Sequence, residues 1–355
     1  MPLMLLFIFI SNSFVVTFNP TSASGVVENS WNTKTSMKYP RYLLGVVAID
    51  DKIYAIGGYT KNEPVGTNER YDPKTDKWVT LASMPTPRGE FAIATHEDKI
   101  YCMGNGPTEV YDTATNSWST KAAMPLAYGD RIHAYVVKGH IFVKDAVSLY
   151  FYAYDPATDV WSDKINLPIS TGFVTASYVV DEKIFFAVER RYSSTESAPD
   201  GTYEQIVLIY DPTVNSWSEE ISRPHIYGYL ATGVTTGLYA PQNVYNFNTD
   251  GGNGNVVCDP LRKTVSTAKD MPTPRKYFGV AVVNDILYVI GGKSEEKDSS
   301  LNQQYIPIGY HGTLPSADAS FKLFLILVAL ILIISIVIFR LFFYHKKRKI
   351  MLKLF

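Results

Sequence analysis

The sequence predicts an all-β protein folded as a six-bladed β-propeller, with a membrane-spanning helix near the C-terminal end. Three observations lead to this prediction. A short segment that begins with Tyr-Asp and ends with Trp recurs along the chain, and a second recurring segment of small and apolar residues lies between its copies. A long apolar run followed by basic residues stands near the end. The two recurring segments define one repeat, and the length of a repeat is diagnostic of architecture.

The first recurring segment is predicted to be a tight turn between two strands. Its fullest form runs from Tyr71 through Asp72 and Pro73 to Trp78. Pro and Asp favour the turn, while the aromatic residues favour the flanking strands. Later copies run from Tyr111 to Trp118, Tyr154 to Trp161 and Tyr210 to Trp217, with a degraded copy from Cys258 to Val265.

The second recurring segment is predicted to be another hairpin. Met84-Pro85-Thr86-Pro87-Arg88 and Met271-Pro272-Thr273-Pro274-Arg275 each precede a strand of small and apolar residues, an Asp or Asn turn and a second strand. Two hairpins per repeat make one four-stranded blade. The spacing between successive Trp-type positions is close to the length of one propeller blade, roughly 40 to 50 residues. Those positions are Trp31, Trp78, Trp118, Trp161, Trp217 and Val265.

The two ends of the repeat region predict how the ring closes. The last hairpin block, which begins near Arg275, finds no Trp after it, whereas Trp31 has no block before it. The N-terminal strand is therefore expected to complete the final blade, giving six blades and no unpaired sheet edge. The six blocks begin near Arg41, Arg88, Gly129, Gly172, Ile226 and Arg275.

The repeat resembles the kelch repeat, which carries a double glycine after the second strand and a Tyr and a Trp farther on. Gly57-Gly58, Tyr71 and Trp78 match it fully, and Gly291-Gly292 with Tyr305 match in the last blade. The resemblance covers about residues 26–310 and weakens in the middle blades. It implies that a partner binds where the loops after the double glycine open around the central channel.

Composition limits the classes of function. The net charge of −1 gives no electrostatic basis for binding nucleic acid, so no nucleic-acid partner is expected. Cys102 and Cys258 fall in blades that are not neighbours, so no disulfide is expected. No two of the six histidines have a metal-ligand spacing, and neither a metal nor another cofactor is expected.

Both ends of the chain predict export and anchoring. Residues 321–344 are predicted to cross the membrane as a single-pass helix, because 323–339 are apolar apart from Ser335. The basic tail at 345–355 predicts a cytoplasmic C-terminus and places the propeller, 25–312, outside the cell at the cell membrane. Residues 313–320 are predicted to be a linker between the propeller and the span. Residues 1–24 are predicted to be a signal peptide or, alternatively, an N-terminal anchor.

Aligning the innermost strands identifies a candidate binding site at the channel mouth. One ring position falls on Leu43, Glu90, Arg131, Val174, Gly228 and Tyr277. The residues just before them include Asp130, Tyr227 and Lys276. Mixed charge and aromatic rings suit a sugar or a peptide. The alternative is that Asp130 and Arg131 pair with neighbouring strands and the tyrosines only line the rim. The candidate ligand-binding residues are Glu90, Asp130, Arg131, Tyr227, Lys276 and Tyr277.

Two functions remain open from the sequence. The first is a membrane-tethered binding module outside the cell that recognises a protein, peptide or glycan through the loop face, with no catalytic residues. The second follows from resemblance to kelch proteins of the mutarotase type, which act on sialic acid. That resemblance implies a sugar-modifying enzyme with Glu90 as acid/base and Arg131 holding a carboxylate.

Overall fold

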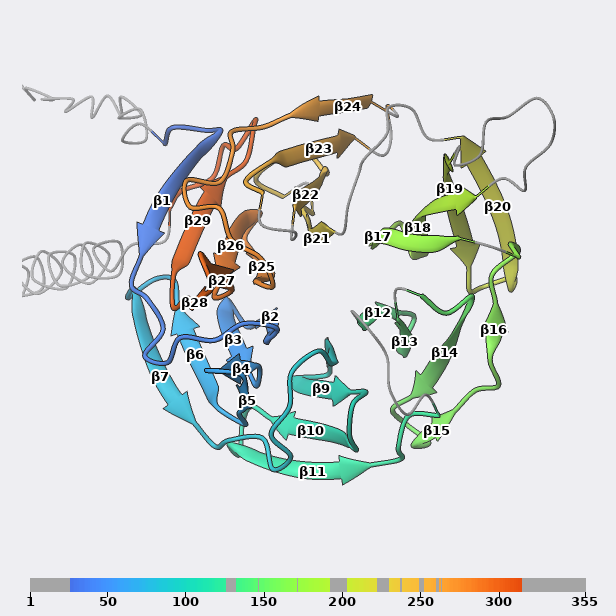
Figure 1. Ribbon diagram of the computed structural model, residues 1–355, viewed down its shortest axis with the longest axis horizontal. Helices are drawn as coiled ribbons and strands as arrows, with labels where there is room; N and C mark the ends of the chain where they lie inside the picture. The colour runs from blue at the N-terminus through green and yellow to red at the C-terminus, as the bar shows by residue number, and fades with distance from the viewer. Residues whose placement is uncertain are drawn as a thin grey trace, which may run out of the picture.

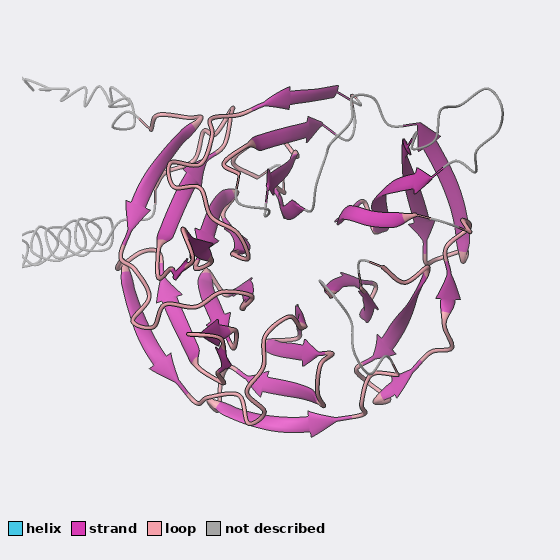
Figure 2. Cartoon of the chain, in the orientation of Figure 1, coloured by secondary structure: helices cyan, strands magenta, loops and turns pink. Residues whose placement is uncertain are grey.

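The structure is a computed structural model that describes residues 26–125, 132–145, 147–170, 172–191, 203–221, 230–236, 238–248, 252–259, 262 and 264–314. In this part of the chain every regular element is a β-strand, and six sheets surround a central axis (Figure 1, Figure 2). A helix that could span a membrane is not found among these residues. The predicted signal peptide 1–24, span 321–344 and tail 345–355 lie outside them.

Each blade is an antiparallel sheet with its first strand nearest the axis. Blade 1 is β2 (Gly45–Ile49), β3 (Lys52–Ile56), β6 (Asn68–Asp72) and β7 (Lys77–Leu81). Blade 2 is β8 (Ala92–His96), β9 (Lys99–Met103), β10 (Thr108–Asp112) and β11 (Ser117–Lys121). Blade 3 is β12 (His133–Val137), β13 (His140–Lys144), β14 (Tyr150–Asp155) and an outer strand divided into β15 (Val160–Trp161) and β16 (Ile165–Asn166).

The remaining blades follow the same order. Blade 4 is β17 (Phe173–Val180), β18 (Lys183–Arg191), β19 (Tyr203–Asp211) and β20 (Ser216–Ile221). Blade 5 is β21 (Leu230–Val234), β22 (Val244–Asn248), β23 (Asn255–Asp259) and β24 (Thr264–Thr267). Blade 6 is β25 (Gly279–Val283), β26 (Ile286–Ile290), β29 (Asn302–Ile306) and β1 (Ser30–Lys34).

The order of strands in blade 6 confirms the predicted closure. β1 pairs antiparallel with β29, with Trp31 opposite Tyr305, so the first strand of the repeat region completes the last sheet. Six blades are thus present, as predicted, and the ring closes on a strand from its opposite end (Figure 1).

Five blades contain the same three-residue cluster, which we call the clasp. It consists of a Tyr and a Trp whose rings pack together and an Asp or Asn that accepts a hydrogen bond from the Tyr hydroxyl. In blade 1, Tyr71 pairs with Trp78 across the sheet, their ring centroids 5.1 Å apart, and the Tyr71 hydroxyl donates to Asp76 Oδ1 at 2.7 Å. The same Oδ1 accepts the Thr35 N–H, and Trp78 Nε1 donates to the Thr35 carbonyl. The clasp therefore grips the segment that arrives from the preceding blade.

The clasp recurs with nearly the same geometry. Its ring pairs are Tyr111–Trp118 at 5.1 Å and Tyr154–Trp161, Tyr210–Trp217 and Tyr305–Trp31 at 5.0 Å. The tyrosines donate to Asn116, Asp159, Asn215 and Asn29. Each of these acceptors has a positive φ, a conformation that Asn and Asp tolerate better than most residues. The Tyr and the Trp were evident from the sequence repeat, whereas this third member was not.

Blade 5 keeps the register without the aromatic pair. Cys258 lies opposite Val265, as the degraded copy predicted. A buried carboxylate from blade 6 supports this blade: Asp285 accepts hydrogen bonds from the backbone N–H groups of Thr236, Tyr239 and Ala240. Burial acts to raise the pKa of Asp285, but these donors outweigh it, so its pKa lies below the ordinary value.

Buried arginines tie the loop at the channel end of three blades. Arg41 donates to the carbonyls of Gly57 and Thr67 and forms a 2.8 Å ion pair with Glu69. Arg88 pairs with Glu109 at 2.9 Å in blade 2. In blade 6 the corresponding partner of Arg275 is the neutral Gln303, and burial lowers the pKa of Arg275 to about 10. The arginines of the Pro-Arg repeat are therefore structural.

In blade 3 a buried lysine, rather than an arginine, bonds the loop carbonyls. Lys144 is 2% exposed, and its Nζ donates to the carbonyls of Asp145 and Ser148. Asp145 follows β13 just as Gly57 follows β3, so this ammonium bonds the carbonyl equivalent to one that Arg41 bonds in blade 1. Burial lowers the pKa of Lys144 to about 8.

Replacing Trp31 by Ala is expected to destabilise the protein by about 3 kcal/mol, because the change removes the ring-closing clasp and leaves a cavity. Denaturant unfolding of the purified chain measures this. Asn32→Ala is the matched control, since Asn32 is exposed on the same strand and is expected to change stability by less than about 0.5 kcal/mol. Equal midpoints for the two variants would contradict closure through Trp31.

Gln303→Glu is expected to stabilise the propeller by about 1 kcal/mol, because it supplies buried Arg275 with the counter-ion found in blades 1 and 2. The reverse change, Glu69→Gln, leaves Arg41 without its counter-ion and is expected to cost about 3 kcal/mol. Unfolding midpoints near pH 7 test both. A lower midpoint for Gln303→Glu than for the unaltered chain would show that blade 6 does not tolerate the charge pair.

Candidate functional site

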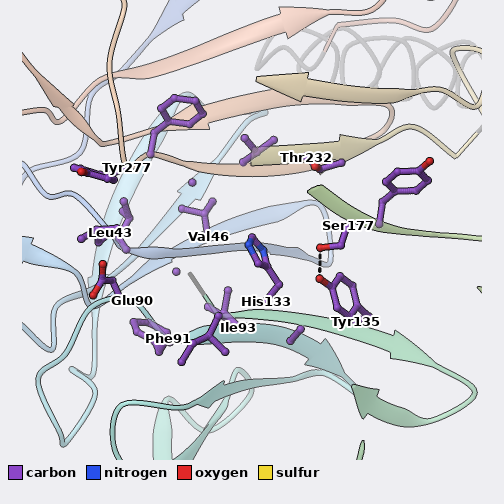
Figure 3. Close-up of a pocket in the computed structure, with 18 of the residues that line it drawn as sticks. Leu43, Val46, Glu90, Phe91, Ile93, His133, Tyr135, Ser177, Thr232 and Tyr277 are labelled. Atoms are coloured by element: carbon purple, nitrogen blue, oxygen red, sulfur yellow. Dashed lines mark hydrogen bonds between the residues drawn. The ribbon is translucent and has the colours of Figure 1, made fainter. Parts of the chain in front are cut away.

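The innermost strands of all six blades surround a central cavity. Its volume is about 510 Å³, and residues of β2, β8, β12, β17, β21 and β25 line it (Figure 3). This volume is in the range of small-molecule binding sites, roughly 300 to 1,000 Å³. Leu43 and Tyr277 line its mouth, and the residue before each of them bridges to the first residue after a double glycine, so this cavity is the candidate site.

The rim of the cavity is built from three equivalent residues with an unusual backbone. Leu43, Glu90 and Tyr277 have φ values of 52°, 53° and 61°, although none is glycine. Their backbones form a chain of hydrogen bonds: Leu43 N–H donates to the Tyr277 carbonyl at 2.8 Å, and Glu90 N–H donates to the Leu43 carbonyl at 3.1 Å. Blades 6, 1 and 2 are thus joined at the mouth, and the left-handed conformation turns each chain into the channel.

The candidate site residues from the sequence fall into three groups. Glu90 and Tyr277 line the cavity, on blades 2 and 6 with Leu43 of blade 1 between them. Lys276 lies beside the rim, where its Nζ bonds Glu296 at 3.1 Å and stands 5.5 Å from the Tyr277 ring centroid. Asp130, Arg131 and Tyr227 lie outside the described residues.

One predicted ring position differs in the structure. Val174 was aligned with Glu90, but it is buried in the core between blades rather than in the channel wall. The pairing of β17 with β18 shifts between Val174 and Ala176, and Thr175, the residue inside the shift, lines the channel instead. A bulge changes which face a side chain occupies, and the sequence pattern did not indicate one here.

Aromatic rings and cations gather at the rim between blades 6 and 1. The Tyr42 ring stacks on Tyr59 with centroids 5.6 Å apart and lies 6.1 Å from the ring of Tyr277. Lys293 Nζ stands 4.9 Å from the Tyr42 ring centroid. Tyr59 and Lys293 are not among the candidate site residues, although each begins a loop that was expected to open at the partner-binding face. Both come directly after a double glycine, and each bridges to its own blade's entry segment, Tyr59 to Tyr42 and Lys293 to Lys276. Their common place directly after a double glycine is the sequence feature that could have identified them.

Charges at this rim are coupled. Glu296 is 75% exposed and contacts both Lys276 and Lys293. The hydrogen bond from Lys276 lowers the pKa of Glu296, and the same bond raises the pKa of Lys276. Burial, with a smaller contribution from the Glu90 charge, raises the pKa of Tyr59. The rim therefore carries anionic and cationic groups beside stacked rings.

Metal chemistry has no identified site in the part of the chain that the structure describes. No group of three or more His, Cys, Asp or Glu side chains there is placed to hold an ion. Cys102 is fully buried and Cys258 is half-buried, and neither forms a disulfide. The site is thus built from aromatic rings, hydroxyls and a few charges.

The fold and its clasps define a kelch-repeat β-propeller. The kelch motif model matches residues 40–85, which span blade 1, and residues 274–305, which span β25, β26 and most of β29 in blade 6. These two motifs, together with the six-bladed fold, support the kelch-repeat propeller family. It is 34% identical over 56 residues to Kelch-like protein 8 of Mus musculus, a match that covers 16% of this chain and 9% of that relative's length.

A solved structure shares the fold. The structure titled "Structure of YjhT" aligns with a TM-score of 0.60 and 14% sequence identity. The alignment covers 76% of this chain and 95% of that one. At this identity the likeness shows the fold alone.

Proposed function

We propose that this protein is a binding module, tethered to the cell membrane with its propeller outside the cell, that recognises a protein, peptide or glycan at the channel mouth. The observation that carries the proposal is the rim of stacked Tyr42 and Tyr59 with Tyr277, Lys276 and Lys293 around a 510 Å³ cavity. Stacked rings beside mixed charges bind polar ligands that also carry apolar area.

The tether belongs to the proposal on sequence grounds. Residues 321–344 are predominantly apolar and are followed by basic residues from His345 onward. This segment lies outside the described residues. A kelch propeller held by one helix would present its channel mouth to ligands in solution or on another surface.

A sugar-modifying enzyme of the kelch mutarotase type is the second candidate. What favours it is that the Glu90 carboxylate lines the cavity, where an acid/base group would have to stand. The Arg131 expected to hold a substrate carboxylate lies outside the described residues. The Glu90→Gln variant distinguishes the two functions. If the protein is an enzyme, the variant is expected to bind the sugar but to lose turnover. If the protein is a binding module, the unaltered chain shows no turnover and the variant keeps its ligand affinity.

Ligand binding at the rim predicts a specific loss on mutation. A ligand at about 100 times its Kd adds about 2.7 kcal/mol to stability, so thermal shifts of the full chain against oligosaccharides and peptides will identify a binder. Tyr59→Ala is expected to weaken that binder about tenfold, because a stacking surface is lost. His140→Ala is the control, since His140 is exposed and starts β13 at the end away from the mouth. Equal losses in both variants would place the ligand elsewhere.

The tether predicts how the protein fractionates. The full chain is expected to remain in membranes after alkaline carbonate washing, whereas a chain ending at residue 320 is expected in the soluble fraction. Immunoblotting of the two fractions measures this. Release of the full chain by carbonate would remove the membrane part of the proposal and leave the binding part intact.

A further inference from the structure

The channel wall has two unlike halves. Below the rim, the residues contributed by blades 6, 1 and 2 are apolar or glycine, including Val46, Ile93 and Val280. Figure 3 shows Tyr135, Ser177 and Thr232 across the cavity from Leu43 and Phe91, and all the polar side chains of the wall below the rim come from blades 3, 4 and 5. They are His133, Tyr135, Thr175, Ser177, Tyr178 and Thr232.

The hydroxyls of the polar half keep bonding capacity for a ligand. Thr175 donates to the Ala187 carbonyl at 3.3 Å and Thr232 donates to Asn246 Oδ1 at 3.2 Å, so each oxygen retains lone pairs that can accept. Tyr135 and Ser177 are hydrogen-bonded to each other, and one of the two donates. The hydroxyl that accepts this bond can donate its own proton to a ligand. This half therefore offers both donors and acceptors.

Formal charge is nearly absent from the cavity wall. Of the described residues that line it, Glu90 at the rim is the one Asp, Glu, Lys or Arg. A charged group placed deeper would lose its hydration without a counter-ion, at a cost of several kcal/mol. The wall therefore favours a neutral occupant.

From these features we infer that the channel binds a neutral pyranose sugar, with the C–H face of the ring against Val46, Ile93 and Val280 and its hydroxyls directed to Ser177 and Thr232. A pyranose has one apolar face and an edge of hydroxyls that each donate and accept, which matches the two halves. A peptide would have to place backbone N–H and C=O groups along the apolar half. The inference rests on the proposed function and narrows its ligand from three classes to one.

The test uses the full chain and saturation-transfer NMR with named probes. The neutral probes are the methyl pyranosides of glucose, galactose, mannose and N-acetylglucosamine at millimolar concentration. The acidic probes are glucuronic acid and N-acetylneuraminic acid, and the peptides that pass the thermal-shift screen are included. At least one neutral sugar is expected to bind, and both Ser177→Ala and Thr232→Val are expected to weaken it about tenfold.

Two further measurements keep the test decisive. Thermal melting shows which variants fold. The Ser177→Ala change removes the hydrogen-bond partner of Tyr135, and if this variant does not fold, Thr232→Val alone tests the inference. His140→Ala again serves as the control and is expected to bind as the unaltered chain does. Failure of every neutral sugar to bind, or unchanged binding in a folded Thr232→Val, overturns the inference. Binding of only an acidic sugar or a peptide also overturns it but upholds the proposed function, whereas no binding by any probe counts against both.

Discussion

The ring is held together by the clasp of Tyr, Trp and Asx. A propeller blade can bury its faces only against its neighbours, so each junction must fix the angle at which the next blade begins. The clasp does this with one side-chain oxygen. Asp76 Oδ1 accepts from Tyr71 within its blade and from the backbone of Thr35 in the arriving segment, whose carbonyl Trp78 holds. Because the same arrangement closes the ring at Trp31 and Tyr305, closure uses the same interaction as the other clasped junctions.

At the inner ends of four blades, a buried cation bonds the loop carbonyls, and the residue that supplies or balances its charge differs from blade to blade. Loop carbonyls near the channel require a buried donor, and a cation supplies several N–H groups from one side chain. Blades 1 and 2 pair that cation with a glutamate, blade 6 pairs Arg275 with Gln303, and blade 3 supplies Lys144 from its own second strand. The regular rim of blades 6, 1 and 2 encloses the apolar half of the channel, and the less regular blades carry its polar half.

Most of the fold could be predicted from the sequence, because its determinants repeat. Tyr and Trp at fixed spacing specified strand register even where Cys258 and Val265 replace them. Less of the site could be predicted. The register of β17 against β18 shifts beside Val174, which buries Val174 between blades and leaves Thr175 in the channel wall, and no residue pattern indicates this shift. The halves of the wall arise from strands of different blades, so their separation appears only when the ring is assembled.

The closing ladder between β1 and β29 has a mechanical consequence. Ser30 lies opposite Ile306, so the chain before β1 and the chain after β29 leave from the same end of the ladder. A pulling force between these two ends would separate the strands one pair at a time, beginning at Ser30, rather than load all five pairs in shear. Such peeling resists force weakly even where the folded state is stable. A propeller held by one end alone would place no load on this seam, whereas one held by both ends would open there first.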